Sequence, residues 1–229
     1  MMVKGSSHRS ASRHHKIQSS RGWIFLTLLA LVAAFFGGAS RYDAIQIVPL
    51  RALSALFLIP AIYYLTREDL KREAVLVSLF GLFVILMGLQ LVPLPPEIWH
   101  DLPGRKAIEQ LDGALGNAEL WRPLSMAPLR TWNSFDSLVL PAAGLLLAIA
   151  LRASTRVLLQ IIAGLGVLNA ALGLFQVISG RSSPLYYYDL TNWGSAVGIF
   201  ANENHSAVFA ACTLLIVARL GLDARRKHI

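Results

Sequence analysis

Residues Ala74–Val92 read AVLVSLFGLFVILMGLQLV, a mostly apolar run without a charged side chain. A helix of about 20 mostly apolar residues crosses the hydrocarbon core of a bilayer, so this run predicts a membrane span. Pro93, Pro95 and Pro96 follow it and stop the helix, because proline lacks the backbone donor and clashes with the preceding turn. Backbone groups in lipid must be paired within their own segment, which makes the span helical.

The composition of the whole chain is that of a membrane protein. Of its 229 residues, 55% are hydrophobic and 15% are charged, and the mean hydropathy is +0.55. Soluble domains carry about 25% charged residues, so the composition argues against an ordinary soluble enzyme and excludes a disordered chain. The single cysteine, Cys212, excludes an intramolecular disulfide and a cysteine-rich metal site.

Five further apolar segments predict spans. We expect an all-α, polytopic membrane helix bundle with about six transmembrane helices, contained in residues 23–222. The alternative for the first segment is a cleaved signal peptide, since small residues follow it at 37–40. An uncleaved helix is the simpler prediction, because five spans come after it. The six expected spans are residues 23–38, 45–65, 74–92, 133–151, 157–178 and 206–222.

The basic residues predict the orientation of the chain. With the amino terminus in the cytoplasm, 14 Lys and Arg residues fall on the cytoplasmic side and 6 on the outer side. This bias places both termini in the cytoplasm, with residues 1–22 as a disordered basic tail and 223–229 as a short basic tail. The loops 93–132 and 179–205 then lie in the periplasm, the first with a short helix within 105–121. Because the net charge of +8 is divided among short clusters, nucleic-acid binding is not expected.

The most polar patch beside an apolar span is Gly198–Ser206, GIFANENHS, which opens the sixth expected span on its outer side. Asn202, Asn204 and Ser206 are candidates for the helix N-cap. The positive end of the helix dipole favours an anion here, and His205 can act as a general base or donate a hydrogen bond to phosphate. The alternative is that these residues only cap the helix and face water.

Arginines form a second group of candidates. Arg51 lies about 9 Å inside the second expected span, at 1.5 Å per residue, and either snorkels to the outer interface or faces a polar cavity. Arg122, Arg130 and Arg181 are expected on the outer side, where a planar guanidinium suits a diphosphate; the alternative is contact with anionic headgroups or water. Most of the polar side chains in or near the spans are expected to hydrogen-bond between helices. These are Gln90, Gln160, Asn169 and Gln176.

Three stretches resemble the amino-terminal half of the O-antigen ligase and O-antigen polymerase superfamily. Leu89–Trp99, LQLVPLPPEIW, is similar to the family's segment after its third helix, and Leu124–Trp132, LSMAPLRTW, to the stretch leading into the next helix. Gly198–His205, GIFANENH, resembles the family's glycine-x-phenylalanine-x-asparagine-x-asparagine-histidine motif, which a helix follows. The resemblance covers most of the chain from Trp23 onward.

The resemblance implies a multi-pass glycosyltransferase of the bacterial inner (cytoplasmic) membrane, in lipopolysaccharide or exopolysaccharide biosynthesis. Such an enzyme transfers a glycan from undecaprenyl diphosphate to an acceptor on the periplasmic side, among membrane lipids and with no cofactor or metal. The acceptor is lipid A–core in ligases and another lipid-linked glycan in polymerases. We predict His205 as a catalytic residue. The substrate-binding residues expected with it are Asn202, Asn204, Arg130, Arg181 and Arg51.

The chain departs from the family in one respect. Family members have further spans and a large periplasmic loop, and that loop carries the histidine and arginines proposed as catalytic; His205 belongs to the upstream motif instead. We therefore expect the chain alone to lack transfer activity and to need a carboxy-terminal half as a separate chain, whether it is a truncated gene product, a fragment or half of a split protein. Two other functions remain open. One is a non-enzymatic membrane protein that binds a lipid-linked glycan or a partner subunit, and the other is a small-solute transporter.

Overall fold

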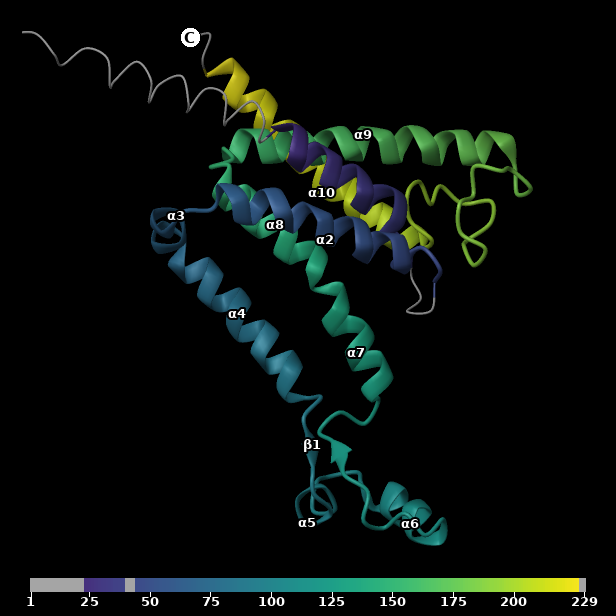
Figure 1. The fold of residues 1–229 in the computed structure, drawn as a ribbon. Helices are drawn as coiled ribbons and strands as arrows, with labels where there is room; N and C mark the ends of the chain where they lie inside the picture. The colour runs from purple at the N-terminus through teal and green to yellow at the C-terminus, as the bar shows by residue number, and fades with distance from the viewer. Residues whose placement is uncertain (1–22, 40–43, 227–229) are drawn as a thin grey trace, which may run out of the picture. The chain divides into compact units, whose positions relative to one another are not determined.

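The fold is mostly helical. In a computed structural model of the chain, residues 23–39 and 44–226 are described (Figure 1); the expected tail 1–22 and residues 227–229 lie outside this part. The chain divides into two compact units, one of residues 1–72 with 139–229 and one of residues 73–138. Each unit is described by itself below.

Four helices in the described residues are long and apolar enough to cross a membrane. They are α2 (Ile47–Tyr64), the continuous stretch Pro128–Ala150, α9 (Thr155–Ser179) and α10 (Glu203–Arg225). This confirms the prediction of a helical membrane protein. The other two expected spans are also helices, but they are shorter: Trp23–Phe36, and α4 at Ala74–Leu89 with 16 residues. Six spans therefore stay a prediction.

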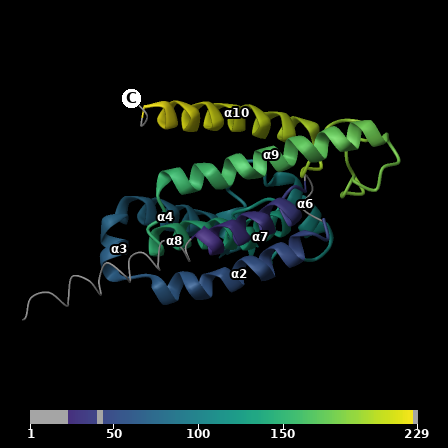
Figure 2. The ribbon, with the colours of Figure 1, turned by 90° about the horizontal axis from the view of Figure 1, so that it is seen from above.

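The first helix, α2 and α8 (Val139–Ala150) share an apolar core. Leu26 and Leu29 of the helix Trp23–Phe36 lie there, together with Leu147 of α8. α2 packs along α8 (Figure 2), and Ala61 of α2 and Ala143 of α8 have no exposed surface. Small side chains at a helix contact let two backbones approach closely, which is how helices associate in lipid.

Asp69, on the short helix α3 (Arg67–Arg72), joins the turn after α2 to the turn after α8. Its carboxylate accepts hydrogen bonds from the Thr66 hydroxyl at 2.6 Å and from Arg152 Nε at 2.8 Å, and Arg72 lies 3.2 Å away. Arg152 has a φ of 49°, which turns the chain sharply after α8. Burial of Asp69 opposes its ionisation, but the hydrogen bonds from Thr66 and Arg152 outweigh this effect and lower the pKa of the carboxyl.

α9 packs on α10 and on the loop of residues 180–202 through a row of glycines and amides. The four buried residues of α9 are Gly166, Asn169, Gly173 and Gln176, whose spacing places them on one helix face. A Cβ at Gly166 would lie 2.2 Å from the side chain of Thr213 on α10, so glycine is needed for this close approach. The four residues are called the amide–glycine seam below. Apolar side chains of α9 lie outside the seam, as expected of a helix that meets lipid.

The second unit, residues 73–138, consists of two helices and a small folded segment between them. The helices are α4 and α7 (Pro128–Ser137). The segment between them, residues 93–123, is called the insert below, and it contains β1 (Pro93–Leu94), α5 (Pro96–Trp99), α6 (Lys106–Ala114) and β2 (Arg122–Pro123). The strands pair antiparallel, with Pro93 opposite Pro123. The short helix expected within 105–121 is confirmed as α6. The helix that contains most of the expected span 133–151 begins before it, at Pro128 of α7, whose fixed φ suits the first helical position.

Arginine side chains hold this insert together. Arg105 is buried and donates to the carbonyl oxygens of Pro123, at 2.9 Å, and Leu124. Arg122 donates two hydrogen bonds to the carboxylate of Asp112, and these bonds lower the pKa of Asp112. Arg122, considered above as a phosphate ligand, is therefore engaged inside the insert.

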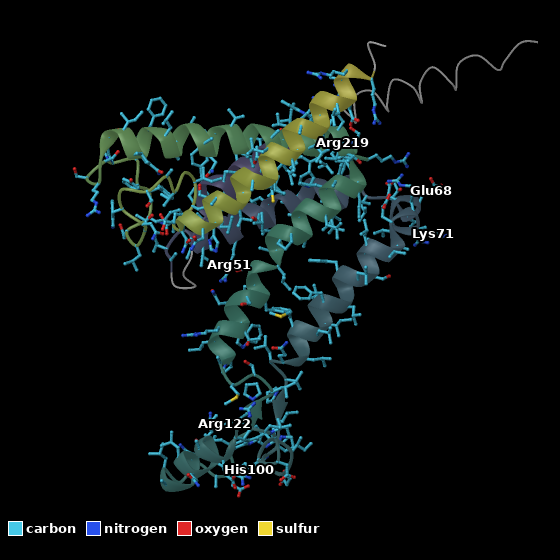
Figure 3. All side chains as sticks on the ribbon, turned by 180° about the vertical axis from the view of Figure 1, so that it is seen from behind. Arg51, Glu68, Lys71, His100, Arg122 and Arg219 are labelled. Atoms are coloured by element: carbon cyan, nitrogen blue, oxygen red, sulfur yellow. The ribbon has the colours of Figure 1, made fainter. Side chains whose placement is uncertain are left out.

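We expect Asp69→Asn to lower the Tm of the detergent-solubilised protein, because Arg152 loses its anionic partner and a hydrogen bond to a charged group contributes about 1.5–3 kcal/mol. The control is Glu68→Gln on the same helix, where the side chain is exposed (Figure 3), and it should leave Tm unchanged. Folding lowers the pKa of Asp69, so its stabilisation is present at neutral pH and is lost as the pH falls through the folded-state pKa. The Tm difference between wild type and Asp69→Asn should therefore shrink below about pH 4. Equal Tm values at pH 7 would contradict the prediction.

Candidate functional site

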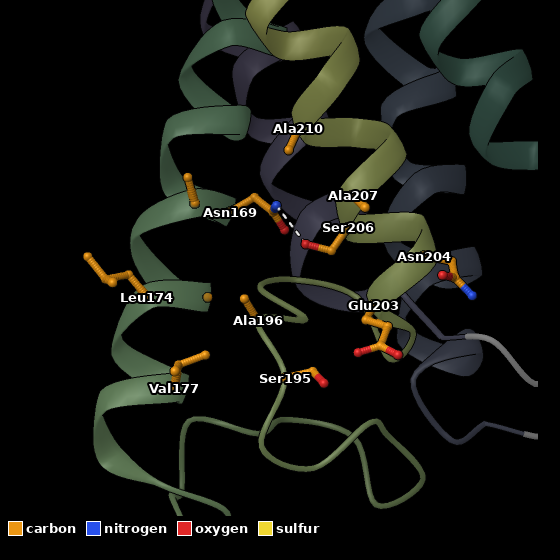
Figure 4. Close-up of a pocket in the computed structure, with 12 residues that line it drawn as sticks. Asn169, Leu174, Val177, Ser195, Ala196, Glu203, Asn204, Ser206, Ala207 and Ala210 are labelled. Carbon is orange, nitrogen blue, oxygen red and sulfur yellow. Dashed lines mark hydrogen bonds between the residues drawn. The ribbon is translucent and has the colours of Figure 1, made fainter.

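A cleft of about 740 Å³ lies between α9, α10 and the loop of residues 180–202 that joins them (Figure 4). The motif Gly198–His205 forms the end of this loop and the start of α10. The wall of the cleft is apolar on the α9 side, with Leu174 and Val177, and polar near the start of α10. The polar or small residues that line it include Asn169, Gly173, Ser195, Glu203, Ser206 and Ala207.

The two amides of the seam hold the loop against α9. Asn169 Oδ1 accepts from the Ile199 N–H at 3.0 Å, and its Nδ2 donates to Ser206 Oγ at 3.1 Å. Gln176 Oε1 accepts from the Gly198 N–H at 2.7 Å, while its Nε2 donates to the Gly198 carbonyl at 3.0 Å. The predicted bond between helices is confirmed for Asn169. For Gln176 it is wrong, because this side chain pairs with the loop backbone.

Two glycines are required at this corner. Gly198 has a φ of 59°, and a Cβ there would lie 2.1 Å from Asn169 Oδ1. Gly38, just after the first helix, accepts a hydrogen bond from the Ala201 N–H at 2.8 Å, and a Cβ there would lie 2.0 Å from the Ile199 carbonyl. Tyr188 lies beside Gly38 as well, and burial raises the pKa of Tyr188 to about 12.

The loop has its own ordered core. The Tyr186 hydroxyl accepts from the Gly194 N–H at 2.9 Å and donates to the Ser195 carbonyl at 3.2 Å. The rings of Tyr186 and Trp193 lie 5.1 Å apart between centroids. These contacts fix the backbone that presents Ser195 to the cleft.

α10 begins at Glu203, three residues earlier than the expected start at Ser206. Asn202 is its N-cap, since Asn202 Oδ1 accepts from the Asn204 N–H at 2.8 Å; this candidate is confirmed. The Glu203 N–H is satisfied by Asn192 Oδ1 at 3.2 Å. Ser206 is not a cap, because it is buried against Asn169.

The structure brings three of the predicted site residues together and leaves three elsewhere. Asn202, Asn204 and His205 meet at the start of α10, but only Asn204 borders the cleft, and its side chain points away from α9 (Figure 4). His205 is exposed, with its ring 6.4 Å from that of Phe200. The other three are not among the residues that line the cleft: Arg51 belongs to α2, Arg181 to the exposed start of the loop, and Arg130 to α7 of the second unit.

Glu203 is the cleft residue that the sequence reasoning missed. Its carboxylate turns toward the part of the loop that carries Ser195 (Figure 4). Glu203, Ala207 and Ala210 follow one another at helical spacing on the face of α10 that meets α9. The small residues at this spacing are not a sufficient signal, because alanine is equally compatible with lipid and with a neighbouring helix. Among the described residues, no arginine or lysine lines the cleft, and no three His, Cys, Asp or Glu side chains are grouped to hold a metal ion.

We expect Gln176→Leu to loosen the loop, because the buried N–H and carbonyl of Gly198 lose their partners and each such bond contributes about 1 kcal/mol. Hydrogen exchange of the amides in residues 180–202 should become about tenfold faster or more. The matched control is Gln160→Leu on the exposed side of the same helix, which should leave this exchange unchanged. The same exchange rates in wild type and Gln176→Leu would show that the seam does not hold the loop.

Comparison with known proteins identifies no relative of the chain. No protein-family model, curated protein or solved structure matches the chain. A functional assignment therefore rests on the cleft and on the motif that borders it.

Proposed function

We propose that the chain is a multi-pass protein of the bacterial inner membrane that engages an undecaprenyl-diphosphate-linked glycan, as a glycosyltransferase of the O-antigen ligase or polymerase type. The observation that carries the proposal is the ordered corner formed by the motif Gly198–His205. Four backbone N–H groups of this corner, at residues 198, 199, 203 and 204, donate hydrogen bonds to side chains. They lie beside a cleft large enough for a small polar ligand. A corner built in this way suits a binding site better than a plain helix cap.

The membrane arrangement belongs to the proposal. All six apolar helices cross the bilayer, both termini lie in the cytoplasm, and the loop 180–202 and the insert of the second unit lie in the periplasm. The distribution of Lys and Arg supports this orientation. The two shorter helices fit if the bilayer thins locally or if flanking residues extend to the interface.

The exposed start of α10 offers the chemistry for transfer. The acceptor hydroxyl attacks the anomeric carbon of the glycan, and the proton of this hydroxyl passes to His205. The bond between the anomeric carbon and the diphosphate oxygen breaks, and the diphosphate leaves with the electron pair. Arg181, Arg130 and Arg51 are the proposed cationic partners of the diphosphate.

The orientation can be tested by cysteine labelling. In a Cys212→Ser background, we expect a cysteine at Gly113, in the insert, to react with a membrane-impermeant maleimide in intact spheroplasts. A cysteine at Lys71, on α3, should react only after lysis. The opposite pattern would overturn the proposed topology.

The binding function can be tested with the full chain in nanodiscs and with undecaprenyl-diphosphate glycans extracted from membranes of the bacterium that carries the gene. We expect His205→Ala to raise the Kd by about tenfold or more, the loss of one hydrogen bond to a charged group. His100→Ala, in the second unit, is the control and should bind like wild type. Failure of the wild-type chain to bind the glycan lipid would refute the function, whereas binding with unchanged affinity in His205→Ala would remove this histidine from the site.

A further inference from the structure

The cleft between α9 and α10 has a polar rim that accepts hydrogen bonds. The Glu203 carboxylate supplies two acceptor oxygens and no donor, and the Ser195 hydroxyl lies across from it. In the part of the chain that the structure describes, no cationic side chain lines the cleft. Such a rim suits a ligand that brings its own donors, for example a set of hydroxyl groups.

The rest of the cleft is apolar and shallow. Leu174 and Val177 form one side, and Ala170, Ala196 and Ala207 leave room between the two helices. A saccharide matches this combination, because its ring presents C–H groups on its faces and hydroxyl groups around its edge. The volume of about 740 Å³ lies within the range of about 300–1,000 Å³ typical of small-molecule sites.

A diphosphate does not match the cleft. Its negative charges would meet the Glu203 carboxylate, and like charges repel one another. Among the described residues that line the cleft, no cation offsets this repulsion. The helix dipole of α10 does not offset this, because Glu203 in the first turn already compensates the positive end of the helix. The exposed outer side of the first turn, where His205 lies, is free of this carboxylate.

We infer that the cleft is a saccharide subsite in which Glu203 accepts hydrogen bonds from sugar hydroxyls, with the diphosphate bound outside it. This inference rests on the proposed function. It assigns the saccharide and the diphosphate of one glycan lipid to opposite sides of the first turn of α10. The saccharide can belong to the lipid-linked donor or to a free glycan, so the test must separate these sources.

The test measures three Kd values for the full chain in nanodiscs. The probes are the extracted undecaprenyl-diphosphate glycans, undecaprenyl diphosphate alone, and the saccharides released from the extract by mild acid. Two variants alter the cleft by different means: Glu203→Gln removes the charge, and Ala207→Leu fills the space. Their controls are Glu119→Gln, an exposed carboxylate of the second unit, and Ala211→Leu, one turn further along α10 and outside the cleft.

Both cleft variants should raise the Kd for the glycan lipid about tenfold or more. Glu203→Gln weakens the hydrogen bonds by removing the charge of their acceptor, and Ala207→Leu occupies the space of the sugar ring. Both should bind undecaprenyl diphosphate as wild type does, and both controls should match wild type for every probe. Unchanged binding of the glycan lipid by the two cleft variants would overturn the subsite and leave the proposed function in place. Tighter binding of undecaprenyl diphosphate by Glu203→Gln would also overturn it, since the diphosphate would then occupy the cleft.

The same experiment distinguishes the two sources of the saccharide, the lipid-linked donor and a free glycan. Weaker binding of the glycan lipid but not of the released saccharides would assign the subsite to the lipid-linked donor. If only the released saccharides bind, and Glu203→Gln weakens them, the subsite is supported while the proposed function fails. If the wild-type chain binds neither glycan, both inferences fail.

Discussion

The amide–glycine seam of α9 is the constraint on which the packing of α9, α10 and the loop between them depends. In lipid, apolar side chains gain little by leaving the bilayer for one another, so helices associate through close backbone approach and hydrogen bonds. The seam supplies both. Gly166 lets Thr213 of α10 come into contact, and the two amides bond to Ser206 and to the loop backbone. The two amides of the seam, Asn169 and Gln176, are buried while many apolar residues of α9 are exposed, the reverse of a helix in a soluble protein.

The seam also sets the chemistry at the start of α10. Because Asn169 and Gln176 fix the backbone at Ile199 and Gly198, the chain reaches the N-cap of α10 in one orientation. That orientation turns Glu203 toward α9 and leaves His205 exposed. The proposed separation of a saccharide from its diphosphate is thus a consequence of how one helix is rotated about its axis.

Apolar run length was enough to predict the helices, and a polar amide inside a span was enough to predict that Asn169 bonds across to another helix. The rotation of α10 was not predictable, because five consecutive polar residues, 202–206, show no helical period. Small residues such as Ala207 mark a face only ambiguously, since alanine is equally compatible with lipid and with a neighbouring helix. The pairing of Arg122 with Asp112 was missed for another reason: it depends on the fold of the insert, and no local spacing encodes it.

The seam also separates two stages in the making of this protein. α9 is apolar and long enough to enter a bilayer alone, so its amides take no part in that step. They act afterwards, when α10 and the loop arrive beside an already inserted helix. A chain in which the seam cannot form would insert into the membrane normally and then expose unpaired amides to the lipid. Unpaired amides in lipid hydrogen-bond to polar groups of other membrane helices. The result of the fault would therefore be association with the wrong membrane proteins.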